Sequence, residues 1–105
     1  MRRLLLPIAC AVLVLGACSE PIPDDAPGAE IYRISCAPCH GAELQGRSGP
    51  RLGGEEAPSI DLSRDYFVDT ITRGRGRMPA FGNRLSEAQI DRVVDFVLER
   101  QGRAP

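Results

Sequence analysis

The sequence contains no lysine, no tryptophan and a single histidine, and only 5% of its residues are aromatic. A chain of this size with so few large side chains has little apolar area to bury, and small domains of that kind usually need a staple besides their core. Charge is nearly balanced, with 13 basic and 14 acidic residues. Without residues 1–17 the chain would have 11 basic and 14 acidic residues. This excess of acidic residues argues against a nucleic-acid partner.

No apolar run is long enough to cross a bilayer, which takes about 20 residues. The longest run, Leu4 to Leu15, follows two arginines and is interrupted by Pro7. A basic start followed by a short apolar stretch is typical of a secretory signal. We therefore predict that residues 1–17 are a signal peptide.

The signal ends in LGAC at residues 15–18, which resembles the lipobox of bacterial lipoproteins. In that family the cysteine, here Cys18, is first diacylated, the signal is then cut before it, and the new terminal amine is acylated last. Several acyl chains, at about 0.8 kcal/mol per buried CH₂, make membrane attachment stable. Many lipoproteins that are retained in the inner membrane have an aspartate directly after the acylated cysteine, whereas this chain has Ser19 there. The resemblance therefore favours attachment to the outer membrane, on its periplasmic side. The alternative is ordinary cleavage near Ala17 with Cys18 unmodified.

Residues 19–27 hold three prolines and three acids in nine positions, the composition of a semi-rigid linker. We expect residues 18–27 to join the lipidated cysteine to a single domain over residues 28–105. A disordered start to that domain would have nearly the same composition.

Cys36, Cys39 and His40 form a CxxCH motif, the attachment signature of a c-type haem. Two thiols one helical turn apart can add across the two vinyl groups of one porphyrin, and the adjacent imidazole can ligate the iron. A zinc half-site or a dithiol redox pair would use the same two cysteines. Zinc would lack its fourth ligand, because Cys10 and Cys18 belong to the signal, and no βαβ context accompanies the CxxC. The motif thus predicts one covalent haem c.

Met78 is the only methionine left after removal of the signal, and the chain offers no second histidine and no lysine. It is therefore the ordinary candidate for the sixth ligand of the iron. His/Met ligation raises the reduction potential and leaves no open position for a substrate, which favours an electron carrier over an enzyme. Met78 as mere core packing is the alternative, and a five-coordinate iron would suit a gas sensor or a peroxidase.

Three helices and no strand are expected. The first runs from about Pro27 to the two motif cysteines, and a loop rich in glycine and proline follows over residues 41–62. A second helix should begin after Ser63 as N-cap and stop at Gly74.

The third helix has the strongest signals, with Ser86 as N-cap, Gln89 closing a capping box and Gly102 at the end. Its apolar residues recur at helical spacing and define one buried face: Ile90, Val93, Val94 and Val97.

Residues 28–102 resemble the small monohaem class I cytochromes c, which implies an all-α fold of three core helices around one haem. Besides CxxCH, the resemblance includes Gly28 and Tyr32, which match the GxxxY/F of the family's first helix. It implies that the last helix crosses closely at Gly28 and that Tyr32 packs against Phe96.

Two further segments carry the resemblance. Residues 49–52, GPRL, look like the loop whose proline carbonyl, here that of Pro50, accepts the N–H of the proximal imidazole of His40. Residues 77–81, RMPAF, look like the MPxF segment that supplies the distal ligand, here Met78.

Three arginines, Arg73, Arg75 and Arg77, lead up to Met78. Their role stays open between docking of an acidic partner, pairing with haem propionates and a merely solvated basic loop.

The sequence as a whole predicts a lipid-anchored, one-electron carrier of the bacterial envelope that exchanges electrons with other redox proteins and has no small-molecule substrate. The alternatives are a fixed haem relay subunit of a membrane dehydrogenase or oxidase and, if Met78 is labile, a haem-based redox or gas sensor.

Overall fold

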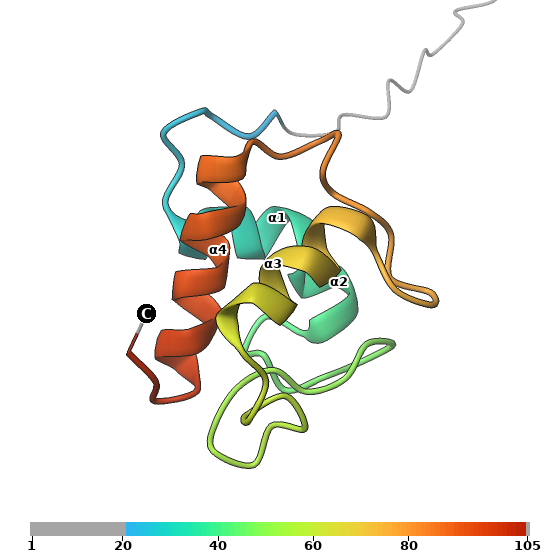
Figure 1. Cartoon of the computed structure of the whole chain (residues 1–105), viewed down its shortest axis with the longest axis vertical. Helices are drawn as coiled ribbons and strands as arrows, with labels where there is room; N and C mark the ends of the chain where they lie inside the picture. Colours follow the sequence, from blue (N-terminus) through green and yellow to red (C-terminus); the bar gives the residue numbers. More distant parts are fainter. Residues whose placement is uncertain (1–20, 105) are drawn as a thin grey trace, which may run out of the picture.

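A computed structural model describes residues 21–104, so the expected signal peptide and Cys18 lie outside the described residues. Within this range the chain forms four helices, and Figure 1 shows how loops join them. Within residues 21–104 the only β pairing is a single bridge between Arg75 and Met78, so the expected all-α class is confirmed. No helix in this range is long and apolar enough to cross a membrane. The helices are α1 (Gly28–Ser35), α2 (Ala37–His40), α3 (Arg64–Arg73) and α4 (Glu87–Arg100).

The first expected helix is divided in two. Its first helical residue is Gly28, with Pro27 as N-cap, and α1 ends at Ser35, before the motif. A separate turn, α2, then carries the last four residues of the motif, with Pro38 in its first turn. Proline has no N–H to donate to the carbonyl four residues earlier, so one continuous helix cannot pass through Pro38 undisturbed. The break leaves the two cysteines on a short turn of their own.

The expected caps are present. The Ser63 side chain accepts the backbone N–H of Tyr66 at 3.2 Å, and α3 ends at Arg73 with Gly74 as its C-cap, at a φ of +74°. Both halves of the capping box at the start of α4 are formed between Ser86 and Gln89. The sequence signals therefore fixed where α3 begins and ends and where α4 begins.

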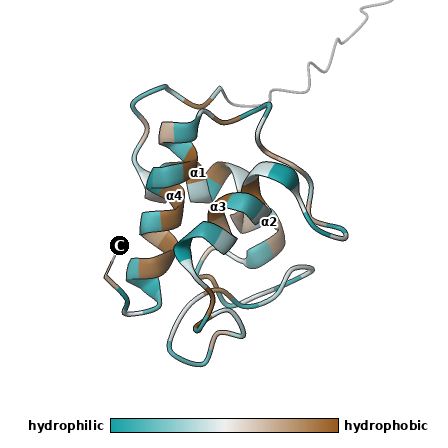
Figure 2. Cartoon of the chain, viewed as in Figure 1, coloured by the Kyte–Doolittle hydropathy of each residue, from teal (hydrophilic) through white to brown (hydrophobic). Residues whose placement is uncertain are grey.

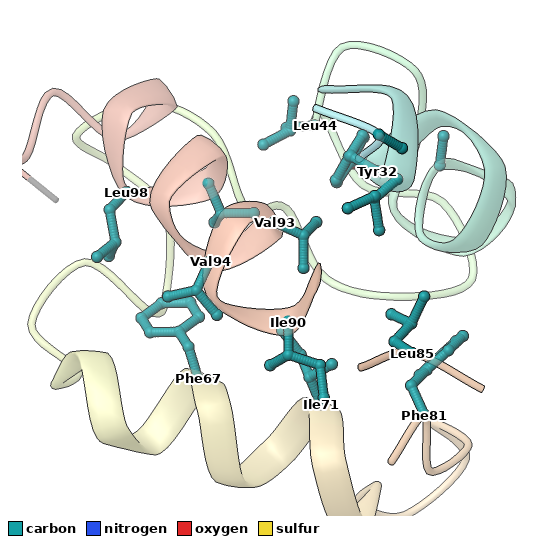
Figure 3. Packing of buried hydrophobic residues seen from close by; sticks show 14 residues of the cluster. Tyr32, Leu44, Phe67, Ile71, Phe81, Leu85, Ile90, Val93, Val94 and Leu98 are labelled. Carbon is teal, nitrogen blue, oxygen red and sulfur yellow. The ribbon is translucent and has the colours of Figure 1, made fainter. Parts of the chain in front are cut away.

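α4 packs against both α1 and α3 and forms the centre of the core (Figures 1 and 3). In Figure 2 its apolar stripe faces the other helices while the polar stripe faces outward. The expected apolar face is confirmed and extends one residue further, to Leu98, which belongs to the same buried cluster (Figure 3). The buried apolar residues of α4 are Ile90, Val93, Val94, Val97 and Leu98.

α1 and α4 cross at very close range, as the resemblance implied. A Cβ added to Gly28 would lie 2.2 Å from the carbonyl oxygen of Arg92 and 3.0 Å from the Cβ of Phe96. Only glycine permits that approach. The rings of Tyr32 and Phe96 then stack in a tilted arrangement with centroids 5.4 Å apart. This crossing fixes α1, and with it the start of the motif, on α4.

The structure differs from the expected linker over residues 21–27. Ala26 is only 2% exposed and Ile22 packs against the core. The carbonyl of Pro23 accepts a hydrogen bond from Gln89 of α4 at 3.1 Å. We call residues 22–26 the N-terminal strap. Its apolar side chains make it part of the folded domain rather than a spacer, although its proline and acid content is that of a linker.

Candidate haem site

His40 is held in one orientation by the loop that follows it. The imidazole is 7% exposed, and Nδ1 lies 2.8 Å from the carbonyl oxygen of Pro50. Because a carbonyl only accepts, Nδ1 must carry the hydrogen, and the lone pair of the neutral ring is then on Nε2. Nε2 makes no hydrogen bond to any residue in the described range. The contact implied by the resemblance is thus confirmed, and it leaves Nε2 available as a metal ligand.

The loop after the motif folds back over the imidazole. Gly46 and Gly49 donate their N–H groups to the carbonyls of His40 and Cys39 at 2.7 and 2.8 Å. A Cβ on Gly49 would lie 2.8 Å from Cε1 of the imidazole, so the backbone there rests directly on the ring. The buried hydroxyl of Tyr32 donates to the carbonyl of Gly41 at 2.7 Å. We call residues 41–50 the histidine clamp. Sequence reasoning missed these contacts, and the only hint of them was the glycine before Pro50.

We predict that Gly49→Ala weakens the site by crowding the imidazole. The added methyl would overlap Cε1 of His40, and overpacking of this kind costs about 1–3 kcal/mol. Urea unfolding of the haem-loaded protein should show that loss. Ser48→Ala, at the exposed neighbouring position, is the control and should change the free energy of unfolding by less than about 0.5 kcal/mol. Equal stability of the two variants would show that the ring is not packed against Gly49.

The two cysteines of the motif differ in environment. Cys36 is half-buried and Cys39 exposed, and neither is in a disulfide. Burial and the neighbouring Cys39 thiol raise the pKa of Cys36 to about 12. Dithiol exchange needs the thiolate, which this environment disfavours at Cys36. Within residues 21–104 no group of three histidine, cysteine or acidic residues is placed to hold a metal ion.

Met78 lies at the end of a tight turn after α3. Arg75 and Met78 exchange two backbone hydrogen bonds, at 3.1 and 2.9 Å. A Cβ on Gly74 would lie 2.6 Å from the carbonyl oxygen of Met78, so the turn is pressed against the end of α3. Phe81 continues this docking with a hydrogen bond from its N–H to the carbonyl of Ile71 at 2.8 Å. These contacts therefore hold in place the backbone that carries the half-buried Met78 side chain.

The three arginines before Met78 are not equivalent. Arg73 pairs with Asp69 at 3.0 Å on the surface of α3. Arg75 lies over the ring of Tyr66, with its guanidinium 5.5 Å from the ring centroid, and hydrogen-bonds the hydroxyl. Arg77 is exposed and makes no ion pair or hydrogen bond with a described residue. Of the three, Arg77 is the cation most available to an external anion.

The donors and the apolar surface around them fit a haem. Two thiols, one imidazole with a free Nε2 and one thioether are the set that a c-type haem requires. Partly buried apolar side chains with some exposed surface pack against the core in or near the same parts of the chain. They are Leu52, Leu62, Val68 and Met78.

An all-α domain with an oriented histidine in CxxCH and a fixed methionine loop defines the class of c-type haem proteins. Residues 23–97 match a family model described as cytochrome c oxidase, cbb3-type, subunit III. The chain belongs to this family of small c-type cytochromes, and it is an electron carrier with one covalently bound haem.

Individual relatives agree with this placement. Cytochrome c6 of Synechococcus sp. strain PCC 6312 is 35% identical, over 76% of this chain and 73% of its own length. The cbb3-type oxidase subunit FixP of Azorhizobium caulinodans is 38% identical over 78% of this chain, which covers only 29% of that subunit. The crystal structure of cytochrome c6C from Synechococcus sp. PCC 7002 is 31% identical, with a TM-score of 0.61, and the match covers 72% of this chain and 96% of that one.

Proposed function

We propose that Cys36 and Cys39 form the two thioethers to the haem and that His40 Nε2 and Met78 Sδ are its axial ligands. When bound, the haem supplies a one-electron Fe(III)/Fe(II) couple. The observation that carries the assignment is the 2.8 Å contact between His40 Nδ1 and the Pro50 carbonyl, because it presents Nε2 with its lone pair free. Pro50 is a positioning residue in this scheme, since it acts on the iron only through the imidazole.

Two axial side chains leave no coordination position for a substrate, so these residues suit electron exchange rather than catalysis. A covering methionine also keeps the iron from small ligands such as carbon monoxide. The fixed backbone around Met78 supports this role, because the turn over residues 75–78 is held by hydrogen bonds and by its packing on Gly74.

The absorption spectrum of the wild-type protein in both redox states tests this function. We expect the spectrum of a low-spin c-type haem in both states and, in the ferric form, the weak long-wavelength sulfur-to-iron charge-transfer band. The ferrous protein should bind carbon monoxide slowly or not at all. Rapid carbon monoxide binding together with a missing sulfur band would instead indicate an open iron and a sensor or peroxidase.

The partners in this proposal are redox proteins of the bacterial envelope. Exposed and without a described partner, Arg77 can meet an acidic surface or a haem propionate. A fixed relay within a membrane complex is the second candidate, and the 38% identity to one segment of an oxidase subunit is consistent with it. Co-purification of a stoichiometric membrane complex would support the relay.

We further propose that the chain is a periplasmic lipoprotein anchored through Cys18, with the outer membrane favoured. The support is in the sequence, from the signal-like residues 1–17, the LGAC segment and Ser19. Export also suits the cofactor, since such bacterial cytochromes are matured outside the cytoplasm.

Replacing Cys18 should separate the anchor from the haem. Cys18→Ala, cleaved by another peptidase, should release a soluble periplasmic protein with an unchanged haem spectrum, whereas the wild type partitions into detergent. Detergent phase separation of membrane fractions measures the difference. An unmodified cysteine in the mass spectrum of the mature wild-type terminus would remove the anchor and leave the cytochrome assignment intact.

A further inference from the structure

The N-terminal strap is attached to α4 by the same side chain that caps the helix. Gln89 is 5% exposed, and its Oε1 accepts the backbone N–H of Ser86 at 2.9 Å. Its Nε2 donates to the carbonyl of Pro23 at 3.1 Å. Both ends of one buried amide are therefore used, one within the capping box and one on the strap. The position of the strap is coupled to the start of α4.

Further contacts hold the rest of the strap. Arg92 Nη2 donates to the carbonyl of Asp24 at 2.5 Å. Ala26 is buried, its N–H bonds the Pro23 carbonyl at 3.0 Å, and Ile22 packs against the core. Proline limits the freedom of the undocked segment, so less conformational entropy is lost on docking. The strap is a bound part of the domain as far back as Ile22.

The strap lies at one end of the molecule. In Figure 1 it runs beside the first turn of α4, while the last turn of α4 and the loops of residues 41–62 lie at the opposite end. Contacts tie those loops to that opposite end: Gly54 donates to the carbonyl of Arg100 at 3.0 Å, and Gln101 donates to the carbonyl of Leu52 at 2.9 Å. The two ends are separated by α4, whose 14 residues span about 21 Å.

The chain between the proposed lipid and the strap is short. Cys18 precedes Ile22 by four positions, and four residues span at most about 14 Å even when fully extended. This reach is less than the length of α4. While the strap is docked, an acylated Cys18 stays near the N-terminal end of α4, and the domain cannot stand on the membrane with its opposite end down.

We propose that the docked strap orients the protein on the lipid surface that holds its acyl chains. The N-terminal end of α4 faces the membrane, and the loops of residues 41–62 face the aqueous space, where redox partners can reach them. This orientation rests on the acylation of Cys18 proposed above. It goes beyond anchoring, because a flexible tether of greater length would let every face of the domain meet the membrane.

The absence of lysine makes the orientation measurable. Once the terminal amine is acylated, a single introduced lysine is the only primary amine of the protein. Ala88→Lys and Ala104→Lys are a matched pair, since both alanines are exposed and one lies in the first turn of α4 while the other lies beyond its last turn. The lipidated, haem-loaded proteins are placed on phosphatidylcholine vesicles that contain a small fraction of a lipid with an amine-reactive ester on its headgroup.

We expect Ala88→Lys to couple to the reactive lipid about tenfold faster than Ala104→Lys, because its effective concentration at the surface is higher. A water-soluble ester should label the two lysines at similar rates. Insertion of about 20 Gly/Ser residues after Ser19 should bring the two lipid-coupling rates close together, since such a linker averages about 25 Å end to end.

Equal lipid coupling of the two variants on the natural tether would overturn the proposed orientation while leaving the anchor in place. A wild type that carries no acyl chains and does not bind the vesicles would overturn both the anchor and the orientation. A tenfold difference that the Gly/Ser insertion abolishes would establish that the short tether and the docked strap set the orientation.

Discussion

Cys36→Ser and Cys39→Ser should each sharply lower the yield of haem-loaded protein, and the double variant should yield almost none. Each thiol supplies one of the two thioethers, so a variant that lacks one thiol can form only one covalent bond to the porphyrin. A small domain with 5% aromatic residues also depends on the porphyrin for part of its core, so the haem-free chain should be largely unfolded. Haem staining of denaturing gels and circular dichroism measure the two effects.

The wild type provides the reference, because its haem should stay with the polypeptide in a denaturing gel and after extraction with acidified acetone. Cys18→Ser, which leaves the motif untouched, is the matched control and should retain haem. Release of free haem b from the wild-type protein would contradict covalent attachment at Cys36 and Cys39.

Met78→Ala should abolish the sulfur-to-iron band and lower the reduction potential. The thioether favours Fe(II), and axial ligands set haem potentials over a range of about 0.8 V, so we expect a drop of about 0.1 V or more. The vacated position should bind water in the ferric state and carbon monoxide in the ferrous state. Spectroelectrochemical titration and carbon monoxide binding measure both consequences.

Met78→His is the informative companion, since it should keep the iron six-coordinate while still lowering the potential. Pro79→Ala, at the exposed next position, should keep the sulfur band and serves as the control for disturbance of the turn. A Met78→Ala protein with an unchanged potential would show that Met78 is only a packing residue, as a partly buried methionine often is.

The elements that the sequence predicted well are those with local chemical signals. The Ser63 and Ser86 caps depend on side chains three residues from their partners, and Gly74 stops α3 through its positive φ. The motif cysteines, His40 and the Pro50 contact also follow from short segments read together with the resemblance. Such signals need no knowledge of the remaining fold.

What the sequence could not supply depends on contacts between distant segments. The sequence around Gln89 predicts only that its side chain closes a capping box. Nothing in that stretch indicates that its Nε2 donates a hydrogen bond to the carbonyl of Pro23, 66 positions away. Gly49 reads as a turn residue, although its position against His40 is set by the folded loop. The position of Arg75 over the Tyr66 ring likewise depends on the turn that follows α3.

The short sequence span of the histidine clamp has a consequence for the order in which the protein is assembled. The residues joined by the Tyr32–Gly41 and His40–Pro50 hydrogen bonds are 9 and 10 positions apart in the sequence. The hydrogen bonds that hold the strap on α4, from Gln89 and Arg92, join residues 66 and 68 positions apart. Closing a longer loop costs more entropy, and a chain synthesised from its amino terminus presents residues 32–50 before α4. The imidazole can thus be oriented while the carboxyl-terminal half is still unfolded, and the Cys39 thiol stays exposed even in the folded domain.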